Sequence, residues 1–190
     1  MAEYTVTVQG ETIRIRTEEG IFSPEHADRG TLAMLSHTAF EAGQRVLDLG
    51  CGCGLVGILA AKKCGEENVF LIDRDEKAAD CALQNAADNS VGNVTVSVSD
   101  GFRDFREAGF DLILSNPPYQ TDFAVAKHFI EKGFNRLKLG GRMLMVTKRL
   151  DWYRNKLRAI FGGVRVYETD GYYVFEAEKR DTRYAGKKRA

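Results

Sequence analysis

The sequence predicts an α/β protein with a doubly wound, mostly parallel sheet. Short apolar runs alternate with segments of helical periodicity along most of the 190 residues, and this alternation is typical of parallel sheets covered by helices. A glycine-rich loop at residues 50–54 joins one apolar run to a helical segment. The dipeptide Asp170-Gly171 separates two further apolar runs and predicts an antiparallel hairpin that closes the sheet.

The amino-terminal part predicts a hairpin followed by a helix. Residues 4–8 and 12–16 each alternate between apolar and polar side chains, and Gln9-Gly10-Glu11 lies between them. Ser23 and Pro24 then read as an N-cap and a proline at the first helical position. We therefore expect a helix from here to about Thr38.

The first strand of the main sheet is expected at residues 46–49, which are apolar apart from Asp48. The loop Gly50-Cys51-Gly52-Cys53-Gly54 follows, and residues 55–63 predict a helix that ends near Gly65. This order of strand, glycine loop and helix lets a ligand approach bare backbone at a helix N-terminus, because glycine has no Cβ to block it.

Two further strands end close to acidic residues. Residues 69–72 precede Asp73, residues 94–98 precede Asp100, and a helix is expected between them at residues 75–88. Open α/β sheets bind ligands at the carboxyl ends of their strands. There Asp73 can accept hydrogen bonds from both hydroxyls of a ribose, and Asp100 is placed to accept one from the exocyclic amine of adenine.

The most informative segment is Asn116-Pro117-Pro118-Tyr119, directly after the apolar run at residues 110–115. Consecutive prolines cannot continue a sheet ladder, so the strand is expected to stop at Asn116. A planar acceptor that carries an amine could stack on Tyr119 and donate hydrogen bonds to the Asn116 side-chain oxygen and the Pro117 carbonyl. This arrangement suits an enzyme that acts on a weakly basic nitrogen.

The remaining elements complete the alternation. Apolar residues repeat at helical spacing over 123–137, Gly140-Gly141 is expected to turn into a strand at 142–146, and a second helix is expected at 152–161. Residues 164–168 and 172–175 form the two strands of the closing hairpin.

The glycine loop alone is ambiguous. Residues 52–57 match the dinucleotide pattern G-x-G-x-x-G, and Asp73 lies about 20 residues further on, as that pattern requires. However, Asp48 stands two residues before the first glycine of the loop, where it would repel a pyrophosphate and attract a cationic ligand. We therefore favour S-adenosylmethionine over a nicotinamide cofactor.

With these motifs in this order, the chain resembles the class I S-adenosylmethionine-dependent methyltransferases over roughly residues 20–179. The resemblance implies a Rossmann-like sheet of seven strands and the product S-adenosylhomocysteine. It implies cofactor contacts by Asp48, Gly50, Cys51, Gly52, Gly54, Asp73, Arg74, Asp100, Gly101 and Asn116. Catalysis is expected from Asn116, Pro117, Pro118 and Tyr119.

Residues 20–31 look like the segment before the catalytic sheet in ribosomal RNA guanine-N2 methyltransferases. Those enzymes often carry two such domains, and this chain is similar to the catalytic half alone. Guanine N2 of ribosomal RNA is therefore the favoured acceptor. Adenine N6 in RNA is the second candidate and a protein glutamine is the third. A nicotinamide-dependent oxidoreductase and a non-catalytic RNA-binding module are the alternatives from other classes.

The bulk properties predict a single cytoplasmic domain. We expect the hairpin region at 1–19, a methyltransferase domain at 20–179 and a basic tail at 180–190. The chain has no apolar run of 18 residues and no signal-peptide pattern. Its four cysteines and three histidines lack metal-ligand spacing, so we expect reduced cysteines and no metal.

The charge is balanced overall but unevenly distributed. Lysine and arginine together match aspartate and glutamate at 27 each, whereas residues 136–165 hold nine basic residues and one acid. Trp152 and Tyr153 stand among these bases, as RNA-binding surfaces often require. We expect RNA, in ribosomal RNA or a ribosomal subunit, to contact this segment and the basic tail.

Overall fold

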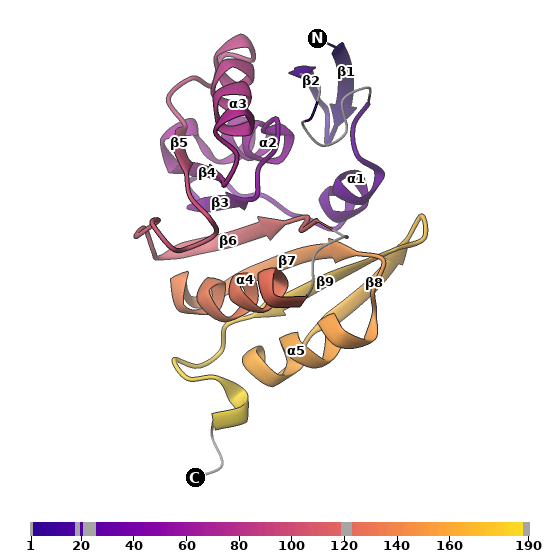
Figure 1. Cartoon of the computed structure of the whole chain (residues 1–190), viewed down its shortest axis with the longest axis vertical. Coiled ribbons are helices and arrows are strands. Elements are labelled where there is room, and N and C mark those ends of the chain that lie inside the picture. The colour runs from indigo at the N-terminus through magenta and orange to yellow at the C-terminus, as the bar shows by residue number, and fades with distance from the viewer. Residues whose placement is uncertain (1, 18–19, 21–25, 119–122, 188–190) are drawn as a thin grey trace.

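The computed structural model describes residues 2–17, 20, 26–118 and 123–187, and it is built around one seven-stranded sheet. The strand order is β5-β4-β3-β6-β7-β9-β8 (Figure 1). The strands β3 to β7 pair in parallel, whereas β9 pairs antiparallel with both β7 and β8. The bounds are β3 Val46–Leu49, β4 Val69–Asp73, β5 Thr95–Val98, β6 Phe110–Ser115, β7 Leu137–Thr147, β8 Arg165–Thr169 and β9 Tyr172–Glu178. The predicted doubly wound sheet is confirmed.

Helices cover both faces of this sheet, because successive strand residues point to opposite sides. Leu71 of β4 belongs to the core under one helical layer, while its neighbours Phe70 and Ile72 belong to the core under the other. One layer holds α1 Arg29–Ser36, α2 Leu55–Cys64 and α3 Glu76–Asp88; the other holds α4 Phe123–Arg136 and α5 Asp151–Phe161 (Figure 1). Short 3₁₀ turns lie at η1 Glu66–Asn68 and η2 Ala185–Lys187.

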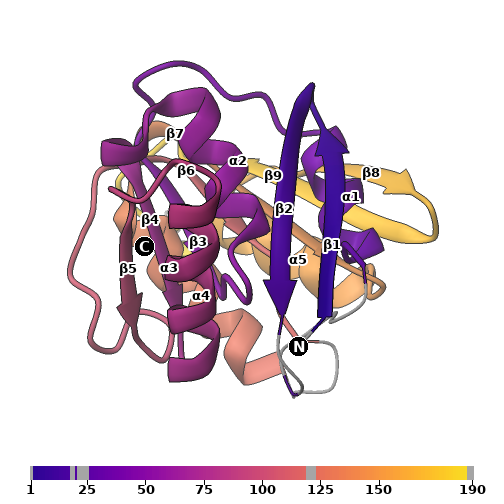
Figure 2. The same cartoon turned by 90° about the horizontal axis from the view of Figure 1, so that it is seen from above.

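The amino-terminal hairpin forms a sheet of its own, with β1 Ala2–Val8 and β2 Glu11–Thr17 (Figure 2). Its free edge is satisfied by side chains of α3. Asn85 accepts from the Arg16 N–H at 3.0 Å and donates to the Arg16 carbonyl at 2.9 Å. Asn89 makes the equivalent pair of bonds with the backbone of Arg14. The two amides thus replace a neighbouring strand and fix the hairpin against the helical layer.

Two predicted boundaries were wrong. The helix expected from Ser23 begins only at Arg29, because Asp28 is its N-cap and accepts from the Thr31 N–H; Ser23 and Pro24 lie outside the described residues. Gly140-Gly141 is part of β7 rather than a turn before it. A register shift in the pairing of β6 with β7 accommodates these glycines, and Gly140 donates to the Lys179 carbonyl.

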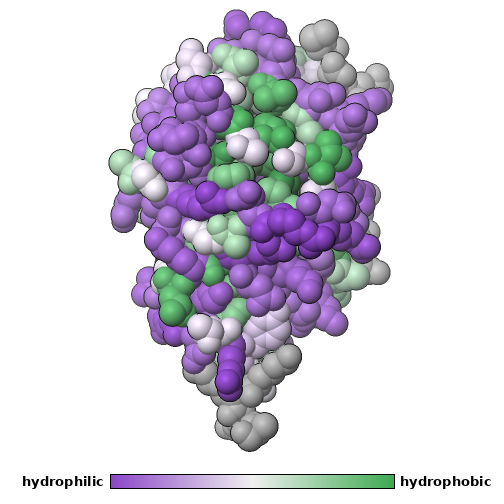
Figure 3. All heavy atoms as spheres, turned by 90° about the vertical axis from the view of Figure 1, so that its left-hand side faces the viewer, coloured by the Kyte–Doolittle hydropathy of each residue, from purple (hydrophilic) through white to green (hydrophobic). Residues whose placement is uncertain are grey.

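The described part of the basic tail packs on the helical layer of α4 and α5. Tyr184 lies edge-on to Phe134, with 5.1 Å between ring centroids, and its hydroxyl donates to the Glu131 carbonyl at 2.9 Å. On the face shown in Figure 3 the surface is largely hydrophilic, and hydrophobic side chains gather in one area of its upper half. None of the helices described here is long and apolar enough to cross a bilayer.

Replacing Asn85 by alanine should lower the free energy of unfolding by about 2–4 kcal/mol, because the change leaves the backbone of Arg16 and the carbonyl of Cys53 without their buried partner. Urea unfolding of the purified protein measures this. Gln84→Ala, at an exposed position of the same helix, is the matched control and should change the stability by less than about 0.5 kcal/mol. Equal effects of the two variants would contradict a clamping role for Asn85.

Candidate active site

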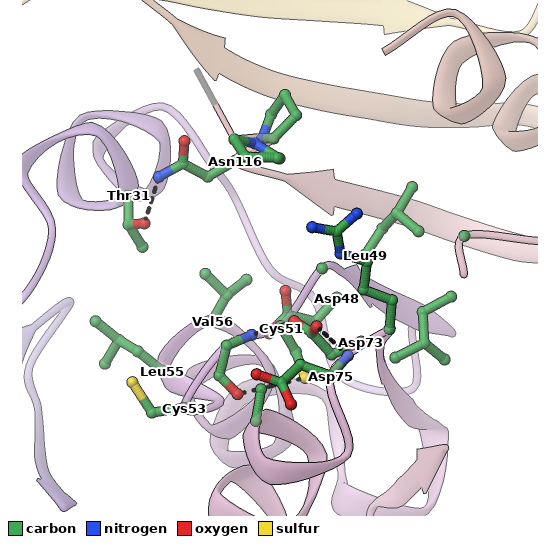
Figure 4. A pocket seen from close by; sticks show the side chains of 18 of the residues that line it. Thr31, Asp48, Leu49, Cys51, Cys53, Leu55, Val56, Asp73, Asp75 and Asn116 are labelled. Atoms are coloured by element: carbon green, nitrogen blue, oxygen red, sulfur yellow. Dashed lines mark hydrogen bonds between the residues drawn. The ribbon is translucent and has the colours of Figure 1, made fainter. Parts of the chain in front are cut away.

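A cavity of about 530 Å³ opens at the carboxyl ends of β3, β4 and β6, where the predicted residues converge (Figure 4). Its wall includes most of the residues expected from the sequence: Asp48, Gly50, Cys51, Gly52, Asp73, Arg74, Asp100, Gly101, Asn116, Pro117 and Pro118. Tyr119 lies outside the described residues. The sequence motifs therefore meet at one place in the fold.

The glycine loop is held by the strand beside it. The N–H groups of Gly50 and Cys51 both donate to the Ile72 carbonyl, at 2.9 and 3.0 Å. Gly52 has a φ of +54° and donates its N–H to Asp73 Oδ2 at 2.9 Å. The loop consequently folds back across the end of β4 and presents bare backbone to the cavity.

Gly54 differs from the other predicted loop residues because it is not part of the cavity wall. It has a φ of +91°, and a Cβ at this position would meet the Cβ of Ala82 at 3.0 Å. The glycine therefore serves the close approach of α2 to α3. The structure gives it a packing role, and its predicted contact with the cofactor has no geometric support.

Asp48 is buried beneath the loop. Its Oδ2 accepts the Gly57 N–H from the first turn of α2 at 2.8 Å, and only 3% of the residue is exposed. Burial raises the pKa of Asp48 to about 7; the nearby Asp73 adds to the rise and the hydrogen bond from Gly57 opposes it. A cation bound in the cavity would favour the ionised form of this carboxyl.

Asp73 organises the loops on both sides of it. Besides accepting from Gly52, its Oδ1 accepts the Asp75 N–H at 3.0 Å. Each carboxylate oxygen can accept more than one hydrogen bond, so both retain capacity for ligand hydroxyls in the cavity. Arg74 is exposed beside it, at the rim.

The segment after β5 forms another wall. Asp100 is exposed and pairs with Arg103 at 2.9 Å, so its carboxylate is open to solvent as well as to the cavity. Gly101 has a φ of +59°, and a Cβ there would lie 2.7 Å from the His128 ring. His128 Nε2 accepts the Phe102 N–H at 3.0 Å, which fixes the segment to α4. Burial lowers the pKa of His128, in agreement with a neutral acceptor nitrogen.

Asn116 stands at the end of β6 with its amide nitrogen bound on one side. The nitrogen donates to Asp28 Oδ1 at 2.7 Å. It also donates to Thr31 Oγ1 at 3.0 Å (Figure 4). Its Oδ1 is buried and has no hydrogen-bond partner in the described part of the chain. A buried amide oxygen without a donor is costly. This atom is therefore a strong candidate for ligand contact.

Sequence reasoning missed several wall residues from elements that lie far from the motifs along the chain. Tyr4 comes from β1, Asp28 and Thr31 from the start of α1, and Val125 and Phe129 from α4. The N-cap pattern of Asp28 and Thr31 was the available signal for α1. Helical periodicity indicated only that α4 faces the core, and Tyr4 belongs to a hairpin whose docking no local pattern reveals.

The cysteines and acids form no metal centre in the described part of the structure, since no group of three potential ligands was found there. The four cysteines are thiols rather than disulfides. Burial raises the pKa of Cys53 to about 12 and that of Cys51 well above its ordinary value, so both thiols remain protonated in the cavity wall.

In the absence of ligand, the stability of the Asp48→Asn variant should fall less with rising pH than that of the unmodified protein. The folded-state pKa of Asp48 is raised from 3.8 to about 7. The ionisation of Asp48 therefore lowers the free energy of unfolding progressively as the pH rises between these two values. The decrease is complete above pH 7. Asparagine keeps an acceptor for Gly57 without ionising. Between pH 5 and pH 8 the variant should gain on the order of 2 kcal/mol relative to the unmodified protein. Urea unfolding at both pH values measures the gain, and a pH-independent difference would contradict it.

Known proteins resemble this chain over most of its length. The family model of the methyltransferase small domain matches residues 12–176. The chain is 33% identical over 172 residues to ribosomal RNA small subunit methyltransferase C of Hahella chejuensis, covering 88% of the chain and 50% of that protein. It is 30% identical over 169 residues to the uncharacterized protein YbxB of Bacillus subtilis, covering 86% of the chain and 84% of that relative.

Among solved structures, the Thermus thermophilus 16S rRNA N2 G1207 methyltransferase RsmC, in complex with AdoMet and guanosine, superposes with a TM-score of 0.86 at 25% identity. The match covers 94% of this chain and 50% of that one. The chain thus spans about half the length of the ribosomal RNA methyltransferases it matches. The fold expected from the resemblance to class I methyltransferases is confirmed, and the chain belongs to the methyltransferase small domain family.

Proposed function

We propose that this protein transfers a methyl group from S-adenosylmethionine to an exocyclic amine of a base in RNA, with guanine N2 of ribosomal RNA as the favoured acceptor. The observation that carries the proposal is the buried Asn116 Oδ1, which has no hydrogen-bond partner among the described residues. Asn116 itself is one of the residues that line the cavity, directly after β6. An acceptor amine would supply the missing donor.

The charge of the cavity supports S-adenosylmethionine. Five aspartates line the cavity, whereas Arg74 is the one basic residue among the lining residues that the structure describes. This suits a cofactor that carries a sulfonium and an ammonium group, and it disfavours the pyrophosphate of a dinucleotide. Asp48 offsets positive charge from beneath the loop, Asp73 has capacity for the ribose hydroxyls, and Asp100 is placed at the adenine end. Ile72 and Phe129 supply apolar wall.

The chemistry that these residues perform is positioning. The bound sulfonium supplies an already activated methyl group, so a nitrogen–carbon bond forms as the carbon–sulfur bond breaks. An exocyclic base amine is a poor nucleophile because its lone pair is delocalised into the ring. Asn116 Oδ1 and the Pro117 carbonyl accept its two hydrogens and direct the lone pair along the line of transfer. The proton in excess then leaves to water.

The relatives favour a guanine acceptor. One similar structure holds guanosine, and similar sequences include ribosomal RNA methyltransferases of both subunits. The base must be unpaired or flipped out of its helix to reach a site at the end of a strand. Adenine N6 presents the same donor chemistry to Asn116 and is the second candidate, followed by a protein glutamine.

The basic segment at 136–165 does not act as one surface. Four of its nine basic residues already pair with acids: Lys138 with Asp111, Arg142 with Glu176, Arg154 with Asp151 and Lys156 with Glu131. Within the described residues, Lys148 and Arg149 form no ion pair; they lie 5.0 Å from the ring centroids of Tyr172 and Phe123. Both residues directly follow β7, which ends at Thr147. Because β6 and β7 are parallel and Ser115 pairs with Met145, the end of β7 lies next to Asn116 at the end of β6.

We infer that Lys148 and Arg149 contact the phosphates next to the target base. Phe123 stacks on Trp152 with 4.4 Å between ring centroids, so an aromatic surface adjoins the two cations. Phe123 and Trp152 are half-buried, and cations beside aromatic rings are typical of surfaces that bind unpaired RNA.

The acceptor can be identified with methyl-labelled S-adenosylmethionine and a panel from cells that lack the gene: both ribosomal subunits, their stripped RNAs, transfer RNA and release factors. Label in N2-methylguanosine from one ribosomal fraction supports the proposal. Label in N6-methyladenosine or in glutamine overturns the substrate but keeps the chemistry, and no label in any fraction overturns the RNA function.

On the acceptor so found, Asn116→Ala should lower turnover about 10²–10³-fold, because it removes an acceptor for the reacting amine. The affinity for S-adenosylhomocysteine, measured by calorimetry, should change much less. Phe129→Leu, in the apolar wall, is a control for general loosening of the cavity. A variant that loses cofactor affinity while keeping its turnover would remove Asn116 from the reaction.

Replacing both Lys148 and Arg149 by alanine should weaken RNA binding and lower its salt dependence by about two units of slope, because each phosphate contact contributes about one. Filter binding of the acceptor RNA at several salt concentrations measures both. The double variant Arg154→Ala/Lys156→Ala is the control, since its cations already pair with acids. The same slope change in both variants would show that the surface at 148–149 has no special part in binding.

A further inference from the structure

The amide of Asn116 is held by the start of α1, an element outside the recognised motifs. Asp28 Oδ1 accepts the amide nitrogen at 2.7 Å, and Thr31 Oγ1 lies 3.0 Å from the same nitrogen (Figure 4 shows the bond to Thr31). Asp28 also accepts the Thr31 N–H at 2.8 Å as the N-cap of the helix. Its carboxylate is thus itself fixed by backbone.

This contact decides which end of the amide faces the reaction. An amide carries a donor nitrogen and an acceptor oxygen on one planar group, whereas a carboxylate only accepts. If the Asn116 amide turned over, its oxygen would face Asp28 Oδ1 at hydrogen-bond distance, and two acceptors would repel each other. The observed orientation gains a charge-assisted hydrogen bond, which is among the stronger kinds. The buried Oδ1 is therefore kept in place as an acceptor.

We propose that Asp28 is a positioning residue: it fixes the polarity of the Asn116 amide so that Oδ1 selects an acceptor group that donates hydrogens. The inference deepens the proposed function and rests on it. It explains why the site discriminates in favour of an amine, since a turned amide would present N–H groups and would favour a carbonyl instead. It also makes the start of α1 part of the site, although Asp28 does not itself need to touch the reacting nitrogen.

The orientation can be observed without any acceptor. In ¹⁵N–¹H spectra of the ¹⁵N-labelled protein, the side-chain amide of Asn116 is identified by its absence in Asn116→Asp. One of its protons should be shifted downfield and protected from exchange, and the Asp28→Ser variant should lose both properties. Serine retains the N-cap, so α1 remains formed. An Asn116 amide with ordinary shifts and rapid exchange in the unmodified protein would overturn the inference.

A polarity swap tests the consequence for catalysis. Asp28→Asn keeps an oxygen for the Thr31 N–H but adds an amide nitrogen, so position 28 can donate as well as accept and no longer fixes the polarity of the Asn116 amide. Turnover should fall about ten- to a hundredfold, with affinity for S-adenosylhomocysteine changed less than about twofold. Asn116→Asp places two carboxylates next to each other and should lower turnover more than Asp28→Asn does. In the double variant Asp28→Asn/Asn116→Asp, the amide introduced at position 28 can donate to the carboxylate introduced at position 116. The second oxygen of that carboxylate remains an acceptor for the amine.

The double variant should therefore be at least about tenfold more active than Asn116→Asp alone. A merely structural role for Asp28 predicts additive losses and no recovery. Additive losses in variants that fold and bind S-adenosylhomocysteine normally would overturn the inference while the proposed function stands. Failure of the unmodified protein to methylate any RNA would instead overturn the proposed function, and the amide spectrum would still decide the role of Asp28.

Discussion

The site depends on one buried interaction, the hydrogen bond from the Gly57 N–H to the Asp48 carboxylate. It joins the end of β3 to the first turn of α2 and so sets the path of the glycine loop between them. Gly57 permits this approach because a Cβ there would meet the side chain of Leu71 at 2.4 Å. The cost is a carboxyl group in a buried place, where its pKa rises to about 7. A cationic ligand above the loop would offset that cost, so the raised pKa of Asp48 and the preference of the site for a cation have the same origin.

The segment that precedes the main sheet supplies part of the cavity wall. The Asn85 and Asn89 side chains hold β2 against α3, and the hairpin in turn brings Tyr4 of β1 to the cavity. The start of α1 adds the Asp28 carboxylate against Asn116. Motif residues from the parallel strands thus provide the floor of the site. The N-cap of α1 thus holds the amide nitrogen of Asn116, and under the proposed function this contact would link a short helix to the polarity of the reaction.

The sequence was most informative where chemistry and backbone geometry coincide. The glycine loop apart from Gly54, the acids at 73 and 100 and the Asn-Pro-Pro segment all lie in the cavity wall, because each of these motifs limits its strand or loop locally. Local signals failed where a later contact decided the outcome. Ser23-Pro24 resembled a helix start, but α1 begins at Arg29, where the Asp28 side chain is the cap and also accepts from Asn116. Gly140-Gly141 resembled a turn, but pairing with Lys179 keeps both glycines in β7. Both contacts join residues that are far apart in the chain, so no local sequence pattern predicts them.

The separation of charges limits how an RNA can lie on this protein. Among the described residues that line the cavity, five are aspartates and one, Arg74, is basic, so a phosphate is repelled from it even though a neutral base is not. Lys148 and Arg149, which form no ion pair with the residues described, stand at the end of β7, next along the sheet from the strand that carries Asn116. An RNA strand can satisfy both conditions only if its backbone remains at β7 and one base turns inward over β6. If the acceptor is RNA, as proposed, the same distribution of charge that suits a cationic cofactor would also select a flipped nucleotide before any base-specific contact is made.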